Sequence, residues 1–155
     1  MAALFLSLHV VAAIIAIGPI TVAASMFPPA LRRARASGPP HEGLGTLRLL
    51  HRLCRVYAYV GIAVPVFGFA TASALGVLGD TWLLVSIGLT GAAAGVLALT
   101  TLPDQAREVA ALDVAEAGGA SVPPGRLAMI TGVFNPLWVV VTVLMIVRPG
   151  STTGV

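Results

Sequence analysis

The chain has 155 residues, of which 57% are hydrophobic and only 10% are charged. A water-soluble domain of this length has too little interior to bury so much apolar surface, so the composition excludes a soluble globular protein and indicates a membrane protein. The formal net charge of +3 does not indicate nucleic-acid binding, because the arginines border apolar segments and no aromatic residues are interleaved with them.

Four apolar stretches follow one another along the chain, at about residues 2–27, 56–78, 82–102 and 127–147. Each has close to or more than the roughly 20 residues that a helix needs to cross the hydrocarbon core of a bilayer. A helix satisfies its backbone hydrogen-bonding groups internally, as a segment surrounded by lipid requires. We therefore predict an all-α, polytopic membrane protein in which residues 1–155 form one domain, an antiparallel bundle of four transmembrane helices.

The first stretch and the arginines predict the orientation of the bundle. No basic residue precedes residues 2–27, and this run is about twice as long as the apolar core of a signal peptide, so we expect a retained helix. Most arginines lie between the first and second stretches, and Arg107 and Arg126 lie in or border the third connection. By the positive-inside rule both connections face the cytoplasm, which places both termini outside. Arginine without lysine, together with abundant Ala and Gly, indicates a GC-rich bacterial genome.

Residues 47–55, just before the second stretch, have the pattern of an amphipathic helix. The basic positions are Arg48, Arg52 and Arg55, and the apolar positions opposite them are Leu47, Leu50 and Cys54. We interpret this segment as a cytoplasmic extension of the second helix, whose arginines fix the topology or bind lipid head groups. The single cysteine is expected to be a packing residue.

The third connection is acidic, with Asp104, Glu108, Asp113 and Glu116. Asp104 follows a proline and suits the start of a helix, and the glycine pair at 118–119 suits its end, so this stretch predicts a short surface helix. Because the first connection is basic and the third is acidic, we expect the two to pack together.

His9 is the one titratable side chain well inside a predicted span, apart from two tyrosines. One interpretation is a neutral imidazole that hydrogen-bonds a hydroxyl group of a neighbouring helix and holds the helices together. The hydroxyl groups at its depth belong to Thr71, Ser73, Thr90 and Thr142. The alternatives are an axial ligand of a b-type haem, a metal ligand or a proton acceptor for a quinone. His41 and His51 lie near the other side of the membrane, so two histidine ligands within one subunit are not expected.

Helix-breaking residues recur at one depth in three of the stretches, at Pro19, Pro65, Asn135 and Pro136. Each proline removes a backbone donor and frees a carbonyl group. The three sites predict either a polar waist of the kind that lines some transporters, or kinks whose freed groups are satisfied by neighbouring helices.

Small residues mark one face of the third stretch, at Gly88, Gly91 and Gly95. Glycine allows two helix backbones to approach closely. This face is therefore expected to pack either inside the bundle or between two subunits.

Both ends of the chain resemble known bacterial membrane proteins. Leu-His-Val-Val-Ala-Ala at 8–13, Ile-Gly-Pro at 17–19 and Pro-Pro-Ala-Leu-Arg-Arg at 28–33 resemble the first helix of the copper-resistance CopD type. Asn-Pro-Leu-Trp at 135–138 and Leu-Met-Ile-Val-Arg-Pro-Gly at 144–150 resemble an uncharacterised bacterial family of integral membrane proteins with a domain of unknown function. The resemblance implies a four-helix inner-membrane protein.

A histidine-bearing first helix is also similar to that of the protoporphyrinogen-oxidase-like membrane family, and this similarity implies a haem at His9. The chain departs from that family because its sequence has no second intramembrane histidine, and it lacks the cluster of Met or His near the outer surface that copper-handling relatives carry.

The sequence contains no motif for hydrolytic or nucleotide chemistry, so an enzyme is not expected. We predict a non-enzymatic accessory or interaction subunit that lies in the lipid bilayer and associates with itself or with other membrane proteins. A redox protein that holds haem b or a metal at His9 is the alternative. A small transporter or channel that uses the polar waist is the second alternative.

Overall fold

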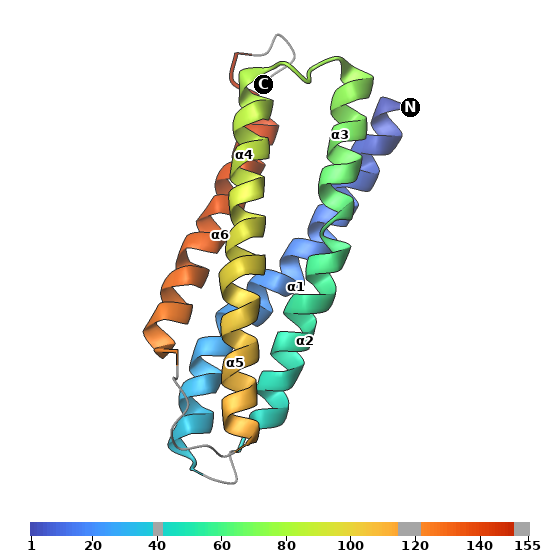
Figure 1. Ribbon diagram of the computed structural model, residues 1–155. Helices are drawn as coiled ribbons and strands as arrows, with labels where there is room; N and C mark the ends of the chain where they lie inside the picture. The colour runs from blue at the N-terminus through green and yellow to red at the C-terminus, as the bar shows by residue number, and fades with distance from the viewer. Residues whose placement is uncertain (39–41, 115–121, 151–155) are drawn as a thin grey trace.

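The computed structural model describes residues 1–38, 42–114 and 122–150, and within these ranges the chain forms helices joined by turns, without a strand (Figure 1). The helices are α1 (Ala2–Ala36), α2 (Leu44–Val60), α3 (Ala63–Leu75), α4 (Thr81–Gly95), the π-helical segment η1 (Val96–Thr101), α5 (Leu102–Asp113) and α6 (Pro124–Val147).

These helices combine into four rods that are long and apolar enough to cross a membrane, which confirms that part of the fold prediction. α1 and α6 each form one rod, α2 and α3 together form the second, and α4, η1 and α5 form the third. Consecutive rods run in opposite directions, so the start of α1 and the end of α6 lie at the same end of the molecule (Figure 1).

Pro65 explains the short break between α2 and α3. A proline has no N–H, so the carbonyl group of Gly61 cannot receive the usual hydrogen bond from four residues further on. Val64 donates its N–H to that carbonyl instead, at 3.1 Å, and closes a tighter turn. The rod therefore changes from α2 to α3 at Gly61 and Ile62.

The helices extend beyond the apolar stretches at the end of the bundle where α1 and α5 finish and α2 and α6 begin. We call this the arginine end. α1 continues to Ala36, and α2 already begins at Leu44, which confirms the amphipathic extension of the second helix. Leu47, Leu50 and Cys54 are buried, as the pattern predicted.

The prediction of a separate surface helix in the third connection is wrong. The helix does not restart at Asp104, because α4 continues through η1 into α5. In η1 the N–H of Leu102 bonds the carbonyl group of Leu97, five residues back, and this change of spacing lets the helix pass Pro103. The predicted end at residues 118–119 lies outside the described residues.

The largest buried cluster lies at the arginine end, where α1, α2, α5 and the residues around the start of α6 meet. Phe27 and Leu31 of α1, Leu47 of α2 and Leu127 of α6 are buried there. A second cluster, farther from the arginine end, joins α1, α4 with η1, and α6 through Ile20, Ala93, Leu97 and Phe134.

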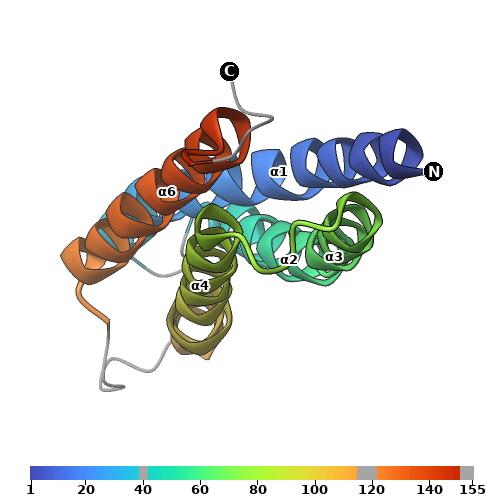
Figure 2. The same cartoon turned by 90° about the horizontal axis from the view of Figure 1, so that it is seen from above.

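Beyond these clusters the rods pack mainly in two pairs, α1 with α3 and α4 with α6 (Figure 2). Large apolar side chains such as Ile14, Leu99 and Met129 are exposed on the outside of the bundle. Such a surface is compatible with the hydrocarbon of a bilayer, because the side chains are apolar and backbone groups are satisfied inside each helix.

Candidate functional site

A row of polar side chains on α5 is buried at the arginine end. Asp104, Gln105 and Glu108 are each about 1% exposed, and Thr101 at the end of η1 is 3% exposed. Their spacing places all four on one face of the helix, the face that packs against the other rods. Two carboxylates in this position require partners, because an unpaired charge away from water is strongly unfavourable.

Glu108 joins three segments of the chain. Its carboxylate accepts hydrogen bonds from the guanidinium group of Arg35, at the end of α1, and from the backbone N–H of Val122, just before α6. Arg35 also donates to the carbonyl oxygen of Val122, at 3.0 Å. Glu108 and Arg35 therefore hold the segment before α6 against α1 and α5.

Asp104 lies between two arginines. Arg107 Nη1 donates to Asp104 Oδ1 at 3.2 Å within α5. Arg126 Nε of α6 lies 3.2 Å from Asp104 Oδ2, but this contact is an ion pair only, since its geometry does not make a hydrogen bond. Asp104 thus links α5 to the first turns of α6.

Gln105 connects the same face to α2. Its Oε1 lies 3.4 Å from His51 Nδ1, and its Nε2 lies 3.7 Å from the sulfur of Cys54, which is buried as expected of a packing residue. Together with the contacts of Asp104 and Glu108, these bonds join all four rods at the arginine end.

The expected packing of the basic and acidic connections is confirmed by two ion pairs, Arg35 with Glu108 and Arg48 with Asp113. The second pair is half exposed on both sides, so it contributes little to stability. All three arginines of the amphipathic extension are exposed, and one of them, Arg48, forms an ion pair with α5. Binding of lipid head groups by this segment stays a prediction.

His9 lies in the half of the bundle away from the arginine end and contacts α3. Its Nδ1 donates to the carbonyl oxygen of Val64 at 2.8 Å, so the acceptor is a backbone group and not one of the hydroxyl groups that we expected. Gly68 explains the difference. A Cβ atom at position 68 would lie 3.0 Å from His9 Cε1, so a larger residue would require the imidazole to shift by a few tenths of an ångström, whereas glycine lets it approach the backbone of α3. Two of the expected hydroxyl groups, those of Thr71 and Thr142, bond carbonyl groups of their own helices.

The residues of the predicted polar waist have different surroundings. Pro65 and Pro136 are exposed, and Pro19 is half-buried. Asn135 faces α1, where its Nδ2 donates to the hydroxyl group of Ser25 at 3.2 Å. A transport path through this level stays a prediction.

The glycine face of α4 points away from the bundle. Gly88 and Gly91 are exposed and Gly95 is half-buried, and a Cβ atom added at any of the three would meet nothing within 4 Å. The buried residues of α4, among them Leu83, Ser86 and Ala93, lie on its opposite side. The sequence left open whether this face packs inside the bundle or between two subunits. In the structure it does not pack inside the bundle.

Sequence reasoning missed the buried polar row because it looked for an apolar face in the third connection. The signal was present, however. Thr101, Asp104, Gln105 and Glu108 have the spacing that normally marks the core-facing stripe of a helix. Here polar residues occupy that stripe, and the arginines that pair with them lie far away in the sequence.

No family model, curated protein or solved structure matches the chain. Within residues 1–38, 42–114 and 122–150, no group of three or more His, Cys, Asp or Glu side chains is placed to hold a metal ion.

Proposed function

We propose that this protein is a non-enzymatic interaction subunit of a bacterial inner membrane, that its arginine end faces the cytoplasm, and that α4 supplies the contact with a second transmembrane protein or a second copy of the chain. The observation that carries this proposal is the outward glycine face of Gly88, Gly91 and Gly95.

Small residues at an outward position favour contact between helices. In lipid no hydrophobic force drives helices together, so association depends on close packing, which small residues permit. Helical spacing places Leu84 and Leu99, which are 55% and 78% exposed, on the same side as the three glycines. α4 and η1 therefore present three glycines between two exposed leucines, an arrangement that lets a partner helix approach closely.

The ionic contacts at the arginine end support the same function in another way. Because they join all four rods, a partner can bind α4 without rearrangement of the helices that carry it. A preorganised surface loses less free energy on binding than one that must first become ordered.

Gly91→Leu tests the proposal. The Cβ atom of the new side chain would meet nothing within 4 Å inside the subunit, and the side chain would cover the glycine face. Self-association is measured by energy transfer between donor-labelled and acceptor-labelled copies of the full chain in liposomes. We expect Gly91→Leu to weaken association about tenfold. Gly18→Leu is the matched control, because Gly18 of α1 is also exposed with no atom within 4 Å of its Cβ position.

The second arm looks for a different partner. A photo-crosslinking residue replaces Leu84 in native membranes, and the same residue replaces Val143 on α6 as a control site, since both side chains are about half exposed. A discrete product from position 84 supports the proposal. The proposal is refuted if Gly91→Leu leaves self-association unchanged and position 84 gives no discrete product that the control position lacks.

A cofactor function at His9 is the second candidate, and one observation favours it. Donation of Nδ1–H to the Val64 carbonyl leaves Nε2 of the neutral ring as the nitrogen with a lone pair. Metal-binding histidines are oriented in this way by a hydrogen bond from their other nitrogen. Oxidised and reduced absorption spectra of the purified protein and of His9→Ala test this candidate. A Soret band that disappears in the variant supports it, and identical featureless spectra from a sample without bound metal contradict it.

A further inference from the structure

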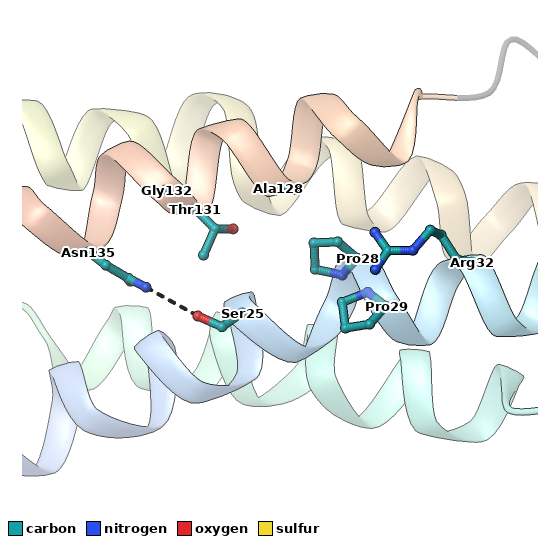
Figure 3. Close-up of a pocket in the computed structure, with 8 residues that line it drawn as sticks. All are labelled: Ser25, Pro28, Pro29, Arg32, Ala128, Thr131, Gly132 and Asn135. Carbon is teal, nitrogen blue, oxygen red and sulfur yellow. Dashed lines mark hydrogen bonds between the residues drawn. The ribbon is translucent and has the colours of Figure 1, made fainter.

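A groove of about 410 Å³ lies between α1 and α6 near the arginine end (Figure 3). It is lined by Ser25, Pro28, Pro29 and Arg32 of α1 and by Ala128, Thr131, Gly132 and Asn135 of α6. Small residues on α6 keep it open, since a Cβ atom at Gly132 would meet nothing within 4 Å.

The two prolines remove hydrogen-bond donors beside this groove. Pro28 has no N–H for the carbonyl group of Ala24. Thr131 Oγ1 of α6 lies 3.4 Å from that oxygen, but its single hydroxyl proton makes the shorter bond to the carbonyl group of Leu127, at 2.9 Å. The carbonyl group of Ser25 lacks both of its ordinary helical donors, since these would be the N–H groups of Pro28 and Pro29. The wall of the groove is therefore polar as well as apolar.

Polar side chains lie at both ends of the groove (Figure 3). At one end, Asn135 uses one of its two N–H bonds on Ser25, and its Oδ1 is buried without a hydrogen-bond partner. At the other end, the exposed Arg32 extends its guanidinium group toward Pro28. Among the described residues, no side chain donates to Asn135 Oδ1 and no carboxylate pairs with Arg32.

Arg32 is available to an anion. The ion pairs among the described residues involve Arg35, Arg48, Arg107 and Arg126. Arg32 takes part in none of them, so within the described ranges its positive charge has no acidic partner. A guanidinium group matches the geometry of a phosphate group and binds it with two hydrogen bonds.

We propose that this groove binds an anionic phospholipid, with the phosphodiester group at Arg32 and the glycerol esters along Pro28 and Ala128 toward Asn135. The phosphodiester and ester oxygens of a phospholipid accept from the guanidinium group of Arg32, the hydroxyl group of Ser25 and the second N–H bond of Asn135, whereas Asn135 Oδ1 is itself an acceptor and takes no part. The acyl chains suit the apolar wall. The positive charge of the arginine end favours an anionic headgroup over a zwitterionic one. This inference goes beyond the proposed function and does not depend on α4.

The test is lipid binding to the full chain, purified in detergent and freed of lipid. Native mass spectrometry follows the titration with dioleoylphosphatidylglycerol and, separately, with dioleoylphosphatidylcholine. Arg32→Gln is the main variant. Arg33→Gln is its matched control, because Arg33 is an exposed neighbour on α1 that loses the same charge but does not line the groove.

We expect the unaltered chain to bind one phosphatidylglycerol more tightly than phosphatidylcholine. Arg32→Gln should weaken phosphatidylglycerol binding about tenfold, the loss of one charge-assisted hydrogen-bonding group, whereas Arg33→Gln should change it by less than about twofold. Gly132→Leu, which fills the groove without a clash at its Cβ, should also weaken binding.

Three results would overturn the inference. Equal losses for Arg32→Gln and Arg33→Gln would show a general charge effect, and unchanged binding in Gly132→Leu would place the lipid elsewhere. Equally tight binding of glycerophosphoglycerol, which is phosphatidylglycerol without its acyl chains, would identify a soluble phosphate ester as the occupant.

Discussion

Replacement of Glu108 by glutamine removes the charge of a buried side chain that joins α5 to α1 and to the segment before α6. The Glu108 side chain is 2% exposed, and its carboxylate accepts from Arg35 and from the N–H of Val122. The amide keeps the size of the side chain and one acceptor oxygen. What is lost is the negative charge that compensates Arg35.

The expected loss of stability follows from the exposure of the two partners. Loss of one partner of a fully buried ion pair costs about 3–5 kcal/mol, because the remaining charge is left uncompensated. The Arg35 side chain is 26% exposed and also bonds the carbonyl group of Val122, so water and that carbonyl stabilise part of its charge. We therefore expect Glu108→Gln to lower the free energy of unfolding by about 2–3 kcal/mol.

The assay is equilibrium unfolding of the purified chain in dodecylmaltoside micelles with increasing mole fractions of SDS, followed by circular dichroism. Asp113→Asn is the matched control on the same helix. Asp113 and its partner Arg48 have side chains that are 52% and 51% exposed, so this substitution should cost less than about 0.5 kcal/mol. The double variant Glu108→Gln with Arg35→Gln should lose less free energy of unfolding than the sum of the losses of the two single variants. Equal unfolding midpoints for Glu108→Gln and Asp113→Asn would refute the reasoning.

Two further predictions concern contacts between rods. Gly68→Ala should destabilise the protein by about 1–2 kcal/mol, because the added Cβ would lie 3.0 Å from the His9 ring. Gly18→Ala, with open space around its Cβ, should not destabilise, and a Gly68→Ala protein as stable as this control would contradict the contact. In a Cys54→Ser background, cysteines at positions 48 and 113 should be joined by a short bifunctional thiol reagent, as the Arg48–Asp113 ion pair requires. Cysteines at 55 and 113 should not react, because residue 55 lies about two helical turns further along α2, and equal crosslinking of both pairs on gel electrophoresis would count against the packing.

The pattern of apolar residues along the sequence predicted four helices long and apolar enough to cross a membrane, and it predicted the amphipathic start of α2. An apolar run of about 20 residues has few structures open to it other than a helix in lipid. The three apolar positions opposite the arginines predicted the buried side of α2 for the same local reason, since helical geometry relates residues three or four apart. The function, the cofactor and the orientation of the bundle stay predictions.

Tertiary structure alone decided which polar groups meet. The sequence predicted surface positions for Asp104 and Glu108, because their partners lie far away in the chain. Arg35 and Arg126 belong to other rods, and Val122 lies just before α6. His9 bonds a backbone carbonyl because Gly68 happens to lie opposite it.

The outward position of the glycine face of α4 could not be predicted from the sequence either. Its small residues suit a contact inside the bundle as well as one between subunits, and local spacing cannot distinguish the two. Which side of a helix is covered depends on where the other rods lie, and residues far apart in the chain determine that position.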